Sequence, residues 1–287
     1  MTKILVTGAN GLVGKILCQK LSEHYNQVYG ITQKTLTEKI TKINYIQLDF
    51  SCSWNAALLP KSMDVIIHLA QSSKFRDFPE NVNDVFNVNV ESTLKLLNYC
   101  KNAGVKKFIY ASSGGVYGGG KTAFMETSQI LPAEKLGFYL GSKIYGEILV
   151  QSYATLMQII VLRPFFIYGP GQNRNMLIPR LINNINTNNP INIAGENGIL
   201  INPIHVEDAS ASIVKAINLK NSGIFNIAGP KVLSLRDICE GIGTYLGKKP
   251  LYIHQSEQAE DLIGDITLMC NKLIYPERNL LESLSTL

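Results

Sequence analysis

The stretch Lys3-Ile4-Leu5-Val6-Thr7-Gly8-Ala9-Asn10-Gly11-Leu12-Val13-Gly14 determines which fold we expect for this chain. An apolar run ends in glycines spaced G-x-x-G-x-x-G, and a helical pattern over residues 12–24 begins at once. Glycines at these places allow a tight turn, a close approach of the backbone to a pyrophosphate, and close packing of helix against strand. The N-terminus of the helix then faces the phosphates. We therefore expect a dinucleotide to bind at Gly8, Asn10, Gly11, Leu12, Val13 and Gly14.

Short apolar runs alternate with helix-length segments along the rest of the chain. Because fully apolar strands between amphipathic helices indicate a parallel sheet covered on both faces, we predict a doubly wound α/β (Rossmann) fold. The pattern weakens after Tyr168, where prolines and asparagines are frequent. This change predicts a small C-terminal substrate-binding lobe, made of residues 166–204 and 229–287, beside a dinucleotide domain of residues 1–165 and about 205–228. The expected strands cover 4–6, 27–31, 45–48, 65–69, 108–111, 159–162 and 225–227, and the expected helices cover 12–24, 85–103, 143–156 and 208–219.

Composition excludes several classes of protein. The net charge is +5, from 27 Lys and Arg against 22 Asp and Glu, but the basic residues are dispersed, which argues against a nucleic-acid surface. The five cysteines show no C-x-x-C pair and no Cys/His spacing suited to zinc, so we expect buried free thiols and no metal site. No apolar stretch of about 18 residues and no cleavable leader is present, and we therefore expect a cytoplasmic protein without a membrane segment.

The end of the second strand bears on the choice of cofactor. In this fold a carboxylate there usually holds the ribose diol of NAD. Here Thr32, Gln33 and Lys34 follow the strand without a carboxylate, and they could hold a 2′-phosphate, which favours NADP. The alternative is that they are exposed loop residues and that backbone and water hold the ribose.

Two further motifs indicate catalysis. Tyr139 and Lys143 are spaced i and i+4, so they share one face of a helix, and an ammonium beside a phenol should lower the phenol pKa. Such a tyrosine can exchange a proton with an alcohol near neutral pH. The strand over 108–111 runs directly into Ser112 and Ser113, at the edge where open α/β sheets bind ligands. Serines that merely cap a strand end are the structural alternative.

Together these motifs resemble those of the extended short-chain dehydrogenases/reductases, the NAD(P)-dependent epimerase/dehydratase group that acts mainly on nucleotide sugars. The resemblance runs nearly from end to end. Besides the segments above, it includes Asp49-Phe50, Asp64 to Ala70, Asn89 to Thr93, Ser112 to Gly118, Arg163 to Gly171 and Ile204 to Asp208.

The resemblance implies roles for individual residues. Ser113 would be the catalytic hydroxyl, Tyr139 the acid and base, and Lys143 the residue that holds the nicotinamide ribose while tuning Tyr139. Asn89 would support the cofactor, and the cofactor cleft would be lined by Asp49, Phe50, Leu69, Ala70, Gln71, Ala111, Ser112, Pro164 and Phe165.

Departures from the family pattern narrow the reaction. Dehydratases of this family place Asp-Glu directly after the catalytic hydroxyl, whereas this chain has Gly114-Gly115, so we do not expect dehydration. Phe166 stands where Asn is common, and Ile201 where an Arg often grips the nucleotide phosphates. The remaining candidates for substrate contacts are Ser72, Ser113, Phe166, Asn173, Arg174 and Arg180. We interpret residues 74–77, Lys-Phe-Arg-Asp, as a solvated loop rather than a phosphate site.

Three hypotheses for the function remain. The first is a nucleotide-sugar 4-epimerase, a reaction that needs a retained cofactor, usually NAD. The second is an NADPH-dependent ketoreductase of a 4-keto sugar nucleotide, and the third, from another class, is a non-catalytic dinucleotide-sensing protein. We expect a homodimer formed by the helices over 85–103 and 143–156. His68 is interpreted as a core histidine, while the role of His205 stays open between structure and substrate.

Overall fold

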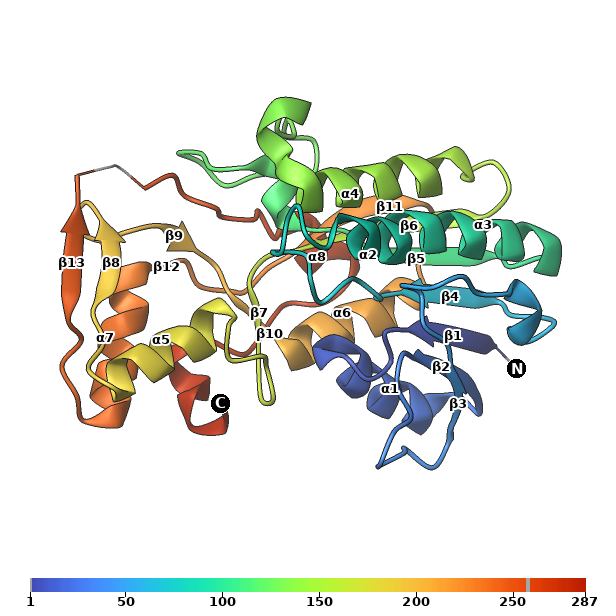
Figure 1. The fold of residues 1–287 in the computed structure, drawn as a ribbon, viewed down its shortest axis with the longest axis horizontal. Coiled ribbons are helices and arrows are strands. Elements are labelled where there is room, and N and C mark those ends of the chain that lie inside the picture. The colour runs from blue at the N-terminus through green and yellow to red at the C-terminus, as the bar shows by residue number, and fades with distance from the viewer. Residues whose placement is uncertain (1, 257–258) are drawn as a thin grey trace.

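The computed structural model describes residues 2–256 and 259–287, and a seven-stranded parallel sheet forms its centre (Figure 1). The strands lie in the order β3-β2-β1-β4-β5-β6-β11, and each neighbouring pair is parallel. The predicted doubly wound α/β fold is thus confirmed. The strands are β1 (Lys3–Thr7), β2 (Gln27–Thr32), β3 (Ile43–Gln47), β4 (Val65–His68), β5 (Lys107–Ala111), β6 (Gln158–Pro164) and β11 (Gly223–Ile227).

Helices cover both faces of the sheet, and each face has its own apolar core (Figure 1). Helices α1 (Leu12–His24) and α6 (Val206–Ile217) pack on one face, where Leu17 and Ile213 are buried. Helices α2 (Val82–Phe86), α3 (Ser92–Ala103) and α4 (Ala133–Ser152) lie over the other face, with Leu96 and Val150 in the second core. Burying one such aliphatic side chain contributes about 1.5–3 kcal/mol.

The two central strands mark the place where a ligand can enter. The chain winds outward from β1 to β2 and β3 on one side, and from β4 to β5, β6 and β11 on the other. Thr7 and His68 lie opposite each other at the carboxyl ends of β1 and β4. Because the connections from these two ends leave in opposite directions, a crevice opens there, as it does in other doubly wound sheets.

A smaller group of elements lies beside the sheet, with its own apolar cluster (Figure 1). Its helix α7 (Leu235–Leu246) begins with a capping box between Ser234 and Asp237 and ends at Gly247, which has a left-handed backbone conformation. Helix α8 (Thr267–Lys272) instead packs Met269 into the core under α1 and α6. The other elements here are β7 (Ile167–Tyr168), α5 (Leu177–Asn186), β8 (Ile191–Ala194), β9 (Leu200–Ile201), β10 (Ile204–His205), β12 (Leu233–Ser234), α7 (Leu235–Leu246) and β13 (Tyr252–Gln255).

The structure corrects several expectations about helices and cysteines. The helix expected from residue 143 begins ten residues earlier, at Ala133, with a kink at Gly137, whose φ is 63°. The helix expected over 85–103 contains a π-helical turn, Asn87–Glu91, between α2 and α3. Cys52 is exposed rather than buried. Within the described ranges, no helix combines the length and apolarity needed to cross a membrane.

The two histidines singled out from the sequence are both structural. His205 precedes α6, and its Nδ1 accepts a hydrogen bond from the Glu207 amide at 3.2 Å. His68 is buried between two hydroxyls, with Nδ1 2.7 Å from Thr7 Oγ1 and Nε2 3.0 Å from Thr93 Oγ1. Thr93 Oγ1 donates its own hydrogen to the Asn89 carbonyl, so it must accept from His68 Nε2. Nδ1 then accepts from Thr7, and the imidazole is satisfied only in its neutral form.

This neutral state predicts acid sensitivity. Burial lowers the His68 pKa to about 3, so between pH 6.5 and 3 the unfolded chain binds a proton that the folded chain refuses. Stability should therefore fall as the pH drops below 6.5, by up to ~1.4 kcal/mol per pH unit from this group. Urea unfolding of His68→Gln between pH 4.5 and 7 should show a shallower pH dependence than the wild type.

His24→Gln is the matched control, because His24 is exposed at the end of α1. The same pH slope in the wild type and in His68→Gln would contradict the neutral, buried assignment.

Candidate active site

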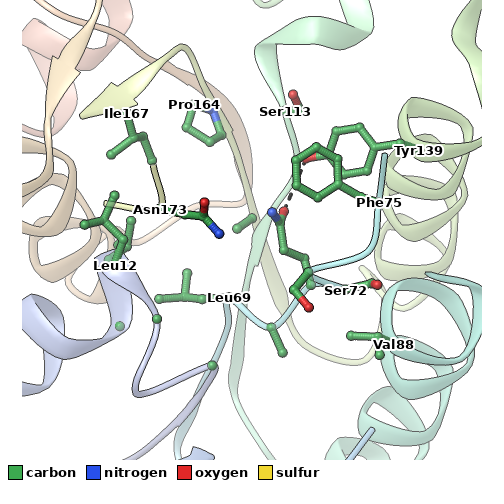
Figure 2. A pocket seen from close by; sticks show the side chains of 18 of the residues that line it. Leu12, Leu69, Ser72, Phe75, Val88, Ser113, Tyr139, Pro164, Ile167 and Asn173 are labelled. Carbon is green, nitrogen blue, oxygen red and sulfur yellow. Dashed lines mark hydrogen bonds between the residues drawn. The ribbon is translucent and has the colours of Figure 1, made fainter. Parts of the chain in front are cut away.

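One large cavity lies between the carboxyl ends of the central strands and the smaller group of elements (Figure 2). Its volume of about 930 Å³ is near the upper end of small-molecule sites. It brings together most of the residues predicted from the sequence. Those on its wall are Gly8, Asn10, Gly11, Leu12, Val13, Gly14, Gln33, Asp49, Phe50, Leu69, Ala70, Gln71, Ser72, Ala111, Ser112, Ser113, Tyr139, Pro164, Phe165, Phe166 and Asn173.

The glycine turn between β1 and α1 fits the phosphates of a dinucleotide. Gly8 has φ 67°, a conformation that favours glycine, and a Cβ on Gly14 would collide with the Gly8 carbonyl oxygen. The N-cap of α1 is Gly11, and the first turn carries no acidic side chain. The free amides and the positive end of the helix dipole therefore face the cavity without a competing carboxylate.

The end of the second strand differs from the expectation. Thr32 is buried and its hydroxyl donates to the Lys34 carbonyl at 3.0 Å, and neither residue lines the cavity. Gln33 does line it, and Gln33 Nε2 donates to Asp49 Oδ2 at 3.1 Å. Burial acts to raise the Asp49 pKa, but hydrogen bonds from Ser51 and Gln33 hold it below the usual value. A carboxylate thus stands at this end of the cavity, supplied from beyond β3.

Tyr139 and Lys143 lie on α4 as predicted, but their electrostatics differ from the expectation. Lys143 is only 2% exposed, its Nζ donates to the Ala111 carbonyl at 3.0 Å, and burial lowers its pKa to about 8. Burial raises the Tyr139 pKa to about 12, against a hydrogen bond with Ser113 and the charge of Arg76. The expected lowering of the Tyr139 pKa was therefore wrong, because desolvation outweighs the nearby charges. Lys143 itself does not line the cavity.

The serines that follow β5 are held by a buried network. Ser113 Oγ accepts from the Gly115 amide at 3.1 Å, and Ser112 Oγ donates to Glu147 Oε1 at 2.5 Å. Arg163, on β6, pairs with both oxygens of Glu147, with Nη2 2.6 Å from Oε2 and Nε 2.9 Å from Oε1. This bidentate pair fixes β5, β6 and α4 relative to one another, because all three groups are buried and satisfied.

Asn89 does not line the cavity but connects two of its walls. Its Oδ1 accepts from the Ser72 amide at 3.0 Å, and its Nδ2 donates to Ser142 Oγ at 2.9 Å. Ser142 Oγ in turn donates to the Tyr139 carbonyl at 2.6 Å. Asn89 lies in the π-helical turn before α3, a kind of irregularity that is frequent at functional sites. Its place is thus beside α4 rather than on the cavity wall.

The segment after β4, which we interpreted as a solvated loop, also borders the cavity. Lys74, Phe75 and Arg76 all line the cavity. The Phe75 ring lies against Tyr139, with centroids 4.6 Å apart (Figure 2), and Arg76 Nη1 donates to the Asn175 carbonyl at 2.9 Å. The sequence signal for these residues was their position directly after a central strand, at the edge where this fold binds ligands.

The substrate candidates from the smaller group of elements are only partly brought together. Asn173 lines the cavity, whereas Arg174 and Arg180 do not. Phe166 lines it with φ 41°, an unusual backbone conformation for a bulky residue. Apolar wall residues that the sequence did not single out are Leu140, Ile167, Met176, Leu177, Ile178 and Leu262. In the parts of the chain that are described, no cluster of His, Cys, Asp or Glu could hold a metal ion.

Comparison with known proteins supports the reading of this cavity. A UDP-glucuronate 4-epimerase from Thermodesulfobacterium geofontis is 28% identical over 263 residues, which is 85% of this chain and 81% of the relative. A mouse dTDP-D-glucose 4,6-dehydratase is 28% identical over 241 residues, which is 78% of this chain and 67% of the relative.

Among solved structures, the fold is similar to UDP-glucuronic acid 4-epimerase from Bacillus cereus in complex with UDP-glucuronic acid and NAD. The TM-score is 0.87 at 26% identity, over 99% of this chain and 97% of the other. A family model described as the NAD dependent epimerase/dehydratase family matches residues 4–228, the range that holds the glycine turn, Ser113, Tyr139 and Lys143. The chain belongs to the NAD-dependent epimerase/dehydratase family.

Proposed function

We propose that this protein is a nucleotide-sugar 4-epimerase that retains NAD through each turnover. The observation that carries this proposal is a single cavity whose wall holds both the glycine turn of β1–α1 and the Ser113 and Tyr139 side chains. A similar chain, the Bacillus cereus epimerase, is described with a UDP-sugar and NAD together.

NAD rather than NADP fits the adenosine end of the cavity. A 2′-phosphate near Gln33 would meet the Asp49 carboxylate, and Lys34 is not on the wall to compensate for it. Gln33 Oε1, in contrast, is available to accept from a ribose hydroxyl. When bound, NAD would accept a hydride from C4 of the sugar and later return it.

The chain's own residues would move the proton. Tyr139 would act as the phenolate, a form that nearby positive charge favours. It would take the proton of the C4 hydroxyl while the C4–H bond breaks, which leaves a ketone, and would give the proton back after the sugar has turned. Ser113 would hydrogen-bond the same oxygen. Lys143 Nζ keeps two hydrogens beyond its bond to Ala111, with which it could hold the nicotinamide ribose.

The positions after Ser113 argue against dehydration. Gly114 and Gly115 have no acid or base to offer, and the Phe165 ring occupies the place of a Gly114 side chain. NADPH-dependent reduction of a 4-keto sugar nucleotide is the alternative, and cofactor analysis separates the two reactions.

The first experiment combines bound nucleotide and turnover. We expect the purified protein to release NAD on denaturation, identified by mass, and to interconvert C4-epimeric UDP-sugars. Tyr139→Phe should keep the NAD but lose about 10²–10⁴-fold in kcat, because it cannot transfer the proton.

Tyr275→Phe, at an exposed tyrosine outside the cavity, is the control and should retain activity. Protein that is empty, takes up NADPH and reduces a 4-keto sugar nucleotide would show that the reductase hypothesis is the correct one.

The anionic part of the substrate would be bound by the loop after β4. Lys74 Nζ is already 3.4 Å from Asp84 Oδ2. Arg76 instead donates to the Asn175 carbonyl and lies over the Phe75 ring, and no carboxylate in the described part of the chain pairs with it. We propose that Arg76 supplies the cation that the family pattern would place at Ile201.

Arg76→Gln should raise KM for a UDP-sugar about ten- to a hundred-fold, because a charge-assisted hydrogen bond contributes about 1.5–3 kcal/mol. Arg174→Gln removes an arginine outside the cavity and should change KM little. A larger rise in KM for Arg174→Gln than for Arg76→Gln in steady-state kinetics would instead place the substrate anion at the smaller group of elements beside the sheet.

We also propose a homodimer through α3 and α4, which lie side by side (Figure 1). On this surface Tyr145 is 62% and Ile148 57% exposed, and Leu94 adds a third apolar side chain. Apolar residues grouped in this way are typical of interfaces.

Light scattering should give twice the chain mass of 31.7 kDa for the wild type. Tyr145→Asp with Ile148→Asp should give the monomer, because two charges cannot be buried unpaired in an apolar interface. A monomeric wild type, or a double variant that stays dimeric, would exclude this interface.

A further inference from the structure

Gln71 makes a direct hydrogen bond with the proposed acid/base. It follows β4 by three residues, lines the cavity, and its Oε1 accepts from the Tyr139 hydroxyl at 3.2 Å. Figure 2 shows Tyr139 pointing into the cavity with Phe75 against its ring. The amide and the phenol therefore meet inside the site.

Buried hydrogen bonds hold the two residues at this spacing. Ser72, the neighbour of Gln71, donates its amide to Asn89, and Asn89 reaches the Tyr139 carbonyl through Ser142. Asn89 and Ser142 are both buried. Since this path joins the loop after β4 to α4, the meeting of Gln71 and Tyr139 is part of the built site.

The other polar groups near Tyr139 have partners of their own. Ser113 Oγ accepts from the Gly115 amide, and Lys143 Nζ donates to the Ala111 carbonyl. Ser113 also hydrogen-bonds Tyr139, but it is the hydroxyl that we assign to the substrate oxygen. Gln71, in contrast, offers the Tyr139 phenol both an acceptor, Oε1, and a donor, Nε2.

A primary amide suits a group that loses and regains a proton. Its oxygen accepts from a neutral phenol, and its NH₂ donates to a phenolate after rotation about the last torsion, which is broad and roughly two-fold. A carboxylate could only accept, and a thioether offers neither function of useful strength.

We propose that Gln71 is a positioning residue that follows the protonation state of Tyr139, with Oε1 accepting from the phenol and Nε2 donating to the phenolate. This inference rests on the proposed function, because an epimerase turnover takes a proton onto Tyr139 and returns it. Gln71 Oε1 supports the neutral phenol in this structure, and during the reaction the same side chain supports the phenolate.

The test compares pH profiles of kcat at saturating UDP-sugar for Gln71→Glu and Gln71→Met. In Gln71→Glu the added charge opposes the phenolate, so the acid limb should move up by about one pH unit or more. In Gln71→Met kcat should fall about ten-fold with a smaller shift of the limb and a KM near that of the wild type. Gln151→Glu, an exposed position near the far end of α4, adds the same charge and should leave the profile unchanged.

An unshifted profile in Gln71→Glu, with Tyr139→Phe inactive, would overturn the inference and leave the epimerase assignment standing. If the wild type epimerises no nucleotide sugar, the assignment fails, and NMR of protein labelled with [ζ-¹³C]tyrosine still tests the pairing. The Tyr139 signal, identified by its loss in Tyr139→Phe, should shift in Gln71→Met. An unchanged signal would overturn the pairing.

Discussion

The close approach of Gly8 to Ala70 is the constraint on which the site depends. A Cβ at Gly8 would lie 3.0 Å from the Ala70 amide nitrogen, so the turn after β1 and the start of the loop after β4 can touch only through glycine. Two hydrogen bonds also connect the two segments. The Ala70 amide donates to Thr7 Oγ1 at 3.1 Å, and Thr7 Oγ1 is hydrogen-bonded to the buried His68. One side of this junction presents the N-terminus of α1 to the cavity, where we propose that the dinucleotide phosphates bind. The other side directs Gln71, Phe75 and Arg76 toward Tyr139.

The sequence was sufficient for features that depend on local order along the chain. The glycine spacing and the seven apolar runs predicted the sheet and the turn, because close backbone packing and burial on both faces leave few other residue choices. The i and i+4 spacing placed Tyr139 and Lys143 on one helix. It could not show that Lys143 Nζ donates to Ala111, since that carbonyl is 32 residues away along the chain. For the same reason the pKa of Tyr139 was predicted in the wrong direction.

The basic residues that we propose bind the anionic part of the substrate could not be assigned from sequence position either. Arg174 and Arg180 lie in the segment where a substrate lobe was expected, yet the cavity wall carries Lys74 and Arg76. Most side chains of the loop over 71–77 are polar and exposed, although Ser72 is buried, and in a sequence this pattern is indistinguishable from a solvated loop. Its place at the cavity depends on long-range contacts such as the bond from Arg76 to Asn175, which is 99 residues away along the chain.

Phe166 lines the cavity in a strained backbone conformation. A φ of 41° is unfavourable for a bulky residue, and strain of this kind costs about 1–3 kcal/mol. Asn tolerates that conformation far better, so the backbone alone gives no reason for Phe at this position. The ring stands on the cavity wall, and it cannot donate or accept a conventional hydrogen bond. Strain is retained where the ring contributes to the site, and here it makes this part of the cavity wall apolar. Under the proposed function, polar recognition of the substrate therefore falls to Lys74 and Arg76, which line the same cavity.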